Sequence, residues 1–198
     1  MDFQDVIRRR RMIRTYDLSR PVRRETIQRL VDNAIRAPSA GFSQGWGFLV
    51  LNEQDDIDRF RQAVTPAQDA DGWLAANVAA PLIIVPMSNR SVYVDRYAKA
   101  EKGHTERDTS WRPAPYWDID TGMAAMSMLL TAVDEGLGAC FFGIPRPTYP
   151  PFRAAFGVPE AFTPIGAISF GYSDEPARDL RARRRRIEDV VHWRRWAD

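Results

Sequence analysis

Arginine side chains gather near both ends of the 198-residue chain. The two clusters consist of Arg8, Arg9, Arg10, Arg11 and Arg14 near the start, and Arg181 with residues 183–186 near the end. A guanidinium group forms strong, often bidentate hydrogen bonds with phosphate or carboxylate oxygens. On a helix, residues four apart share one face, so Arg10 and Arg14 could converge on one dianionic phosphate. The other interpretation of this first cluster is a solvated basic face.

The C-terminal cluster could contribute to the same phosphate site. In an extended strand alternate residues point the same way, which would align Arg184 and Arg186. A nucleic-acid-binding tail competes with this interpretation. The net charge of only +2, and the absence of aromatic residues interleaved with the basic run, argue against nucleic acid.

Two further segments have the composition of ligand contacts. Residues 37–46 (APSAGFSQGW) form a small-residue loop in which Ser39 and Gln44 could orient a planar heterocycle. Residues 136–143 (GLGACFFG) form a glycine-punctuated strand, in which Gly143 permits close approach and Phe141 or Phe142 could pack on an aromatic ring. In isolation, a plain helix-to-strand connection and an ordinary core strand explain them as well.

The sequence lacks the motifs that other common enzyme chemistries and metal sites require. The sequence contains no G-x-G-x-x-G, no P-loop, no G-x-S-x-G and no paired-carboxylate signature, and His104 and His192 have no identifiable Ser or Cys partner. The single Cys140 cannot form an internal disulfide and is expected to be a small core residue, and no metal site is predicted. An acidic N-terminus and short apolar runs predict a cytoplasmic chain that neither carries a signal peptide nor enters a membrane.

The spacing of apolar residues predicts one domain over residues 1–198, with helices alternating with short strands. The first segment is expected to be a helix up to Pro21 that carries the arginines on its charged face. Further helices are predicted at 24–36, 57–64, 73–78, 118–135 and 150–156, strands at 48–51, 82–85, 139–142 and 165–170, and a long loop or lid at 88–117. These elements predict an α+β fold with a central antiparallel or mixed sheet.

The predicted helix at 118–135 is apolar nearly all round. Ile119, Met123, Met126, Leu130 and Val133 recur every three to four residues, and most residues between them are apolar as well. Such a helix must be buried on most sides. In a chain of this size we expect a second subunit to cover one face, which predicts a homodimer.

Four segments, taken in order, resemble the nitroreductase family of flavoproteins. They are RRMIRTY at 10–16, APSAGFSQGW at 37–46, DTGMA to GLGA over 120–139, and the last strand with the Arg-rich tail that ends in DVV at 189–191. The sequence departs from the family pattern in three places. Met12 replaces a serine, Phe42 an asparagine and Gly45 a proline.

The resemblance implies an intertwined homodimer that binds FMN in a pocket shared between the subunits. It implies that the phosphate is held by arginines and that other residues line the flavin on two faces. The cofactor residues so implied are Arg10, Arg11, Met12, Arg14, Pro38, Ser39, Ala40, Gln44, Phe141, Phe142, Gly143, Arg184 and Arg186. The substrate residues expected near the entrance are Phe42, Tyr93 and Trp111.

The resemblance also implies the reaction. NAD(P)H would reduce FMN and leave, and a flat acceptor such as a nitroaromatic or quinone would then take the hydride in a ping-pong cycle. No catalytic side chain is predicted, because the flavin itself accepts and returns the hydride. The sequence does not decide between NADH and NADPH as reductant, or between FMN and a deazaflavin as cofactor. Two other functions also remain open. One is a flavin-storage or sensing protein without turnover, and the other is an anion- or nucleic-acid-binding module.

Overall fold

The computed structural model describes residues 1–65, 79–99, 114–176 and 183–196 of the chain. Its elements in chain order are α1 (Phe3–Arg9), α2 (Arg24–Ala34), a 3-10 turn (Ala40–Phe42), β1 (Trp46–Leu51), α3 (Gln54–Val64), β2 (Leu82–Asn89), α5 (Arg90–Tyr97), α6 (Tyr116–Asp134), β3 (Gly138–Phe142), a 3-10 turn (Arg146–Thr148), α7 (Tyr149–Phe156), β4 (Phe162–Pro164), β5 (Ala167–Gly171) and a 3-10 turn (Ile187–Asp189).

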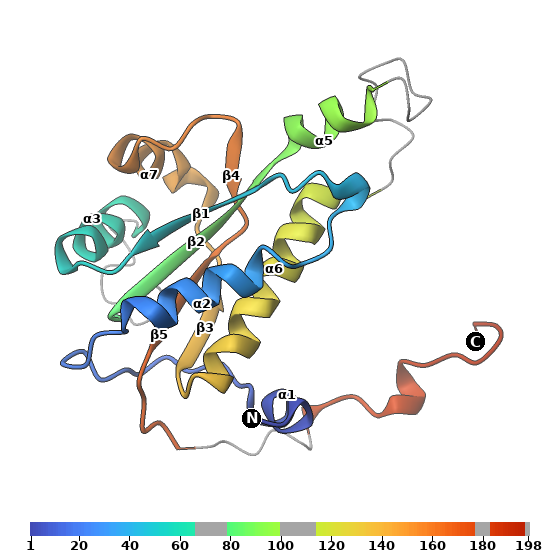
Figure 1. Ribbon diagram of the computed structural model, residues 1–198, viewed down its shortest axis with the longest axis horizontal. Coiled ribbons are helices and arrows are strands. Elements are labelled where there is room, and N and C mark those ends of the chain that lie inside the picture. The colour runs from blue at the N-terminus through green and yellow to red at the C-terminus, as the bar shows by residue number, and fades with distance from the viewer. Residues whose placement is uncertain (66–78, 100–113, 177–182, 197–198) are drawn as a thin grey trace.

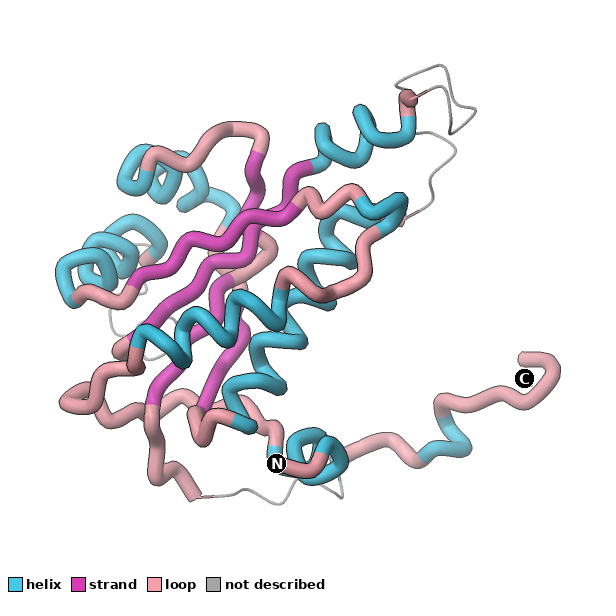
Figure 2. The backbone as a smooth tube through the Cα atoms, in the orientation of Figure 1, coloured by secondary structure: helices cyan, strands magenta, loops and turns pink. Residues whose placement is uncertain are grey.

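The strands form one five-stranded sheet in the order β1-β2-β5-β3, and β4 also pairs with β2. Every pairing between these named strands is antiparallel, which confirms the predicted antiparallel sheet. Helices α2 and α6 cover one face, and α3 and α7 cover the other (Figures 1 and 2). The α+β fold class is therefore confirmed.

Burial on both faces explains the unbroken apolar run in β2. Leu82 and Ile84 belong to the core under α2 and α6, and Ile83 and Val85 to the core under α3 and α7. A strand covered on both sides has no need of alternating polar residues. Such a strand appears in the sequence as a continuous apolar segment.

The strand β2 continues beyond its predicted end at residue 85, although Pro86 follows. Proline has no N–H for a sheet hydrogen bond and is expected at strand edges or irregular points. Here it lies where the neighbour of β2 changes, because β5 pairs with Leu82 to Ile84 and β4 pairs with Met87 to Asn89. The backbone N–H that Pro86 lacks would therefore lie in the gap between β5 and β4, where no partner strand needs it.

The same change of strand depends on Gly166, which lies between β4 and β5 with a φ of +154°. A Cβ there would lie 2.5 Å from Cζ of Phe141 and 2.7 Å from the carbonyl oxygen of Phe142. We expect Gly166→Ala to lower the free energy of unfolding by about 2–3 kcal/mol, measured by urea denaturation. Gly122→Ala is the matched control, since a Cβ there meets nothing within 4 Å, and it should be neutral or slightly stabilising. Equal stability of both variants would contradict the close approach at Gly166.

One predicted segment differs from the structure where the structure describes it, and another lies outside the described residues. The predicted loop at 88–117 contains the end of β2, all of α5 and the first residues of α6, while residues 100–113 are not described. The sequence does not predict α5, because this helix is short and its polar and apolar residues show little amphipathic pattern. The helix predicted at 73–78 lies outside the described residues.

Helix α6 keeps an exposed apolar stripe although its other side is buried. Ala124, Ala125 and Met128 pack into the core, whereas Met123 and Met126 are 37% and 40% exposed. Ile119 and Tyr116 extend the exposed stripe by about two turns toward the helix start. Across the described parts of the chain, no helix is both long and apolar enough to span a membrane.

Candidate functional site

The N-terminal arginines do not lie on one helix, so the predicted helical face is wrong. Helix α1 ends at Arg9, and Arg10 has an extended ψ of 122°. The chain then pairs with β3, as the Ile13 N–H donates to the Ala139 carbonyl at 2.9 Å and Met12 forms an isolated parallel bridge with Ala139. This sheet contact overrides the local helical spacing.

The extended segment still suits an anion, over a wider span. Residues two apart in a strand point the same way, so Arg10 and Arg14 can share a side, with Cα atoms roughly 13 Å apart. Among the described residues, neither guanidinium group forms an ion pair with a carboxylate. Two long cationic side chains therefore flank one surface without a counterion from the described part of the chain.

Arg11 differs from Arg10 and Arg14 in that its guanidinium group already has a partner within the chain. Its guanidinium donates to the carbonyl oxygen of Glu175, just after β5. The Glu175 carboxylate in turn accepts from the N–H groups of Arg14 and Thr15 at 3.1 and 3.3 Å. Arg11 and Glu175 therefore fix the backbone of the arginine segment against the start of the C-terminal tail.

The predicted contacts from β3 lie beside this segment. The Phe141 N–H donates to Sδ of Met12 at 3.4 Å, which brings residues of two separate predicted motifs together. Gly143 is exposed, and a Cβ there would meet nothing within 4 Å. The Phe142 side chain is buried in the core with Phe152, so only its main chain could contact a cofactor.

The loop from Pro38 to Gln44 forms a tight turn with unusual backbone angles. Phe42 and Gln44 each have a φ of 53°, a left-handed conformation that is uncommon for residues other than glycine. Ser39 stabilises the turn through its Oγ, which accepts from the Gln44 N–H at 3.0 Å. The Phe42 side chain is 77% exposed at the tip of the turn.

The loop is anchored from below by a buried carboxylate. Oδ2 of Asp120, in α6, accepts from the Ala40 N–H at 2.7 Å and from the Tyr93 hydroxyl at 2.8 Å. Burial, followed by the hydrogen bond to Asp120, raises the pKa of the Tyr93 hydroxyl, so it stays protonated and acts as a donor. The Tyr93 side chain is fully buried in this single chain. Its contact with a substrate stays a prediction.

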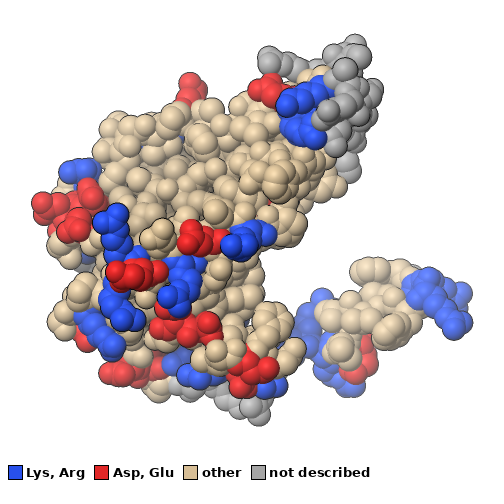
Figure 3. All heavy atoms as spheres, viewed as in Figure 1, with Lys and Arg blue, Asp and Glu red and all other residues tan. Residues whose placement is uncertain are grey.

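The tail arginines lie on an extended segment of the chain that has no strand and a short 3-10 turn among its described residues. Residues 183–196 project beyond the body of the molecule (Figure 1), and Figure 3 shows basic side chains at both ends of this tail. Nε of Arg186 pairs with Glu188 at 3.0 Å, whereas Arg184 forms no ion pair within the described part of the chain. Within the described residues, Arg183 and Arg184 are therefore both unpaired with a carboxylate, and either could meet an external anion.

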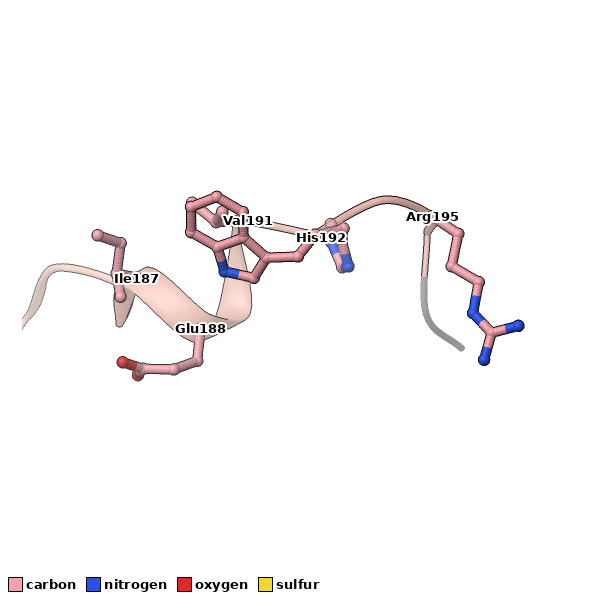
Figure 4. Close-up of a pocket in the computed structure, with 6 residues that line it drawn as sticks. Ile187, Glu188, Val191, His192 and Arg195 are labelled. Atoms are coloured by element: carbon pink, nitrogen blue, oxygen red, sulfur yellow. The ribbon is translucent and has the colours of Figure 1, made fainter.

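A shallow hollow on the tail is lined by Ile187, Glu188, Val191, His192, Trp193 and Arg195 (Figure 4). Trp193 is 84% exposed, so the hollow is a surface feature of the turn and not an enclosed cavity. Trp111, the remaining predicted substrate residue, lies outside the described residues. Cys140 is buried, which confirms it as a core residue, and burial raises the pKa of its thiol.

A model of the nitroreductase family matches residues 7–172, which include the arginine segment, the anchored loop and all five strands. The chain belongs to the nitroreductase family. The resemblance drawn from the four sequence motifs is thereby confirmed. The match ends before the described tail, so the tail arginines are not covered by it.

Named nitroreductases resemble the chain along nearly its whole length. A protein of Archaeoglobus fulgidus named as an NADH dehydrogenase/NAD(P)H nitroreductase is 26% identical, over 94% of each chain. A Clostridium difficile nitroreductase family structure has a TM-score of 0.73 at 21% identity, over 99% of this chain and 100% of that one. A nitroreductase from Exiguobacterium sibiricum, solved in complex with FMN, has a TM-score of 0.70 at 20% identity, covering 98% and 97%.

Two residues that hold the segments of the candidate site together were not predicted as site residues from the sequence. Glu175 follows a predicted strand, and nothing local indicates that it contacts Arg14 and Thr15. Asp120 carries a signal, because it is a carboxylate in an otherwise apolar helix and buried acids need partners. Its partners, Ala40 and Tyr93, could not be named without the fold.

Proposed function

We propose that this nitroreductase is an FMN-dependent oxidoreductase that transfers hydride from NAD(P)H to a small flat acceptor such as a nitroaromatic or quinone. The observation that carries the proposal is the position of Arg10 and Arg14, neither paired with a carboxylate of the described residues, beside β3 and the exposed Gly143 that follows it. This surface offers cationic donors for a phosphate next to a backbone that a ring can approach closely.

The described residues fit FMN in their chemistry. Arg10 and Arg14 would hold the phosphate, with Arg11 and Met12 contributing main-chain contacts, because the Arg11 guanidinium is already bound to Glu175. Pro38, Ser39, Ala40 and Gln44 would lie against the ring or ribityl chain on one side. Phe141, the Phe142 main chain and Gly143 would lie on the other.

When bound, FMN supplies the hydride-accepting and hydride-donating chemistry, which protein side chains do not. The chain would supply position, charge and exclusion of water. Guanidinium groups would compensate the phosphate charge, and the exposed ring of Phe42 would cover the acceptor from the tip of its loop. No side chain of the described site is proposed to transfer a proton.

The dimer belongs to the same proposal. The exposed stripe of Tyr116, Ile119, Met123 and Met126 on α6 has the spacing of a helix–helix contact. The tail projects away from its own body (Figure 1), as it would if it reached across to a second copy. Arg184 would then complete the phosphate site of the partner protomer, and the substrate entrance would lie between the two subunits.

Turnover distinguishes this function from its rivals. Purified protein loaded with FMN should oxidise NADH or NADPH in the presence of menadione or nitrofurazone, with parallel double-reciprocal plots that indicate a ping-pong cycle. Yellow protein without turnover would favour a flavin-storage or sensing protein. Colourless protein that DNA cellulose retains in a salt-sensitive manner would favour an anion- or nucleic-acid-binding module. Loading a deazaflavin in parallel would show which cofactor supports the reaction. The cytoplasmic location stays a prediction.

A further inference from the structure

One buried carboxylate holds together three segments that are far apart in the sequence. Asp120 is 2% exposed, and its Oδ2 accepts hydrogen bonds from the Ala40 N–H and the Tyr93 hydroxyl. Ala40 opens the turn of the proposed flavin loop, Tyr93 belongs to α5, and Asp120 lies in the second turn of α6. The loop, α5 and α6 therefore share one polar contact point.

The loop needs such a support because its backbone is strained. Three of its residues, Gly41, Phe42 and Gln44, have positive φ, and for the two residues with a Cβ this conformation is unfavourable. The surrounding structure must therefore impose it. Arg96 provides a second support, since its Nε donates to the Gly41 carbonyl at 2.9 Å.

The Tyr93 ring is itself held in place by packing. A Cβ at Gly45 would lie 2.5 Å from Cε2 of Tyr93, so the ring occupies the space that a larger residue would need. On another side it meets Trp117 edge to face, with ring centroids 6.4 Å apart. The far end of the loop, at Gly45, therefore packs against the same tyrosine whose hydroxyl binds Asp120.

We infer that Asp120, acting with Tyr93, is a positioning residue that sets the geometry of the loop 39–45 at the redox site. It touches neither cofactor nor acceptor in this assignment. It acts through Ala40 and Gly45, which lie on either side of Phe42 and Gln44, the residues proposed to contact the acceptor and the flavin. The inference rests on the proposed function for its effect on activity, but its effect on the loop can be measured without any cofactor.

The test compares Asp120→Ala, Asp120→Asn and Tyr93→Phe with wild type in three measurements. Amide hydrogen exchange of residues 39–45 in the apoprotein reports the loop itself. FMN titration gives the Kd, and steady-state kinetics with menadione give KM and kcat. Tyr149→Phe is the matched control, because its hydroxyl donates to the Pro164 carbonyl at 3.1 Å outside the proposed site.

We expect Asp120→Ala to raise loop exchange and the FMN Kd by roughly tenfold, and to raise the KM for menadione more than it lowers kcat. Asp120→Asn keeps an oxygen that can accept both hydrogen bonds, so it should return to within about threefold of wild type. Tyr93→Phe should fall between them, and it decides the matter if Asp120→Ala does not fold.

Two results would overturn the inference. The first is unchanged loop exchange and FMN affinity in Asp120→Ala or Tyr93→Phe. The second is an Asp120→Asn variant as impaired as Asp120→Ala, since the charge and not the hydrogen bonding would then matter. If wild-type protein neither binds FMN nor oxidises NAD(P)H, the proposed function fails, while loop exchange in the apoprotein still decides the positioning role.

Discussion

Replacing Arg14 with alanine should weaken FMN binding by about 1.5–3 kcal/mol, or roughly 10- to 150-fold in Kd. The reason is the loss of charge-assisted hydrogen bonds to a phosphate that carries nearly two negative charges. Because the Arg14 side chain is exposed and forms no ion pair among the described residues, its removal should leave the free energy of unfolding of the apoprotein within about 0.5 kcal/mol of wild type. Titration of apoprotein with FMN, followed by flavin fluorescence, measures the change.

Arg24→Ala is the control for the charge alone. Arg24 is an exposed arginine at the start of α2, so the variant loses the same charge at a different place. It should bind FMN as wild type does. Equal weakening in both variants would point to a general attraction of the cationic surface, and wild-type affinity in Arg14→Ala would remove Arg14 from the site.

Met126→Glu is expected to separate the dimer and, with it, to reduce flavin binding. Met126 is 40% exposed in the single chain, so a glutamate is tolerated there unless a second copy covers it. A charge buried without a partner costs about 3–5 kcal/mol, which predicts at least a 100-fold weaker dimer. Sedimentation velocity across a dilution series, with flavin absorbance recorded together with protein absorbance, follows both effects.

Leu18→Glu is the matched control for Met126→Glu. Leu18 is 62% exposed in a loop outside the α6 stripe, and its replacement should change neither the sedimentation coefficient nor the flavin content. A Met126→Glu protein that remains a dimer with full flavin would place the interface elsewhere. A wild-type protein that sediments as a monomer and still binds flavin would contradict a shared pocket.

The parts of the fold that sequence could predict are those governed by local periodicity. The helix at 118–135 and the strand at 139–142 agree closely with α6 and β3, because apolar spacing in each reflects the core that it contacts. The strand at 82–85 ended too early, because the effect of Pro86 depends on which strands lie beside it. Strand β4 went unpredicted, since three residues carry too little pattern.

The parts of the site that sequence could not predict are contacts between distant segments. Arg10 and Arg14 were assigned to a helix because nothing in their neighbourhood reveals that Ile13 pairs with Ala139. The resemblance placed Ala40 near the flavin, but it gave no reason to join Ala40 to Asp120. Such contacts depend on how whole helices and strands pack against one another. Composition and residue spacing do not reveal which distant segments meet.

The most direct test of FMN-dependent hydride transfer is an anaerobic titration of the purified protein, loaded with FMN and passed through a desalting column. We expect a yellow protein with about one FMN per chain, whose visible absorption is bleached by NADH or NADPH and restored by menadione. Protein that leaves the column colourless, or a bound flavin that neither nicotinamide cofactor bleaches, would contradict it.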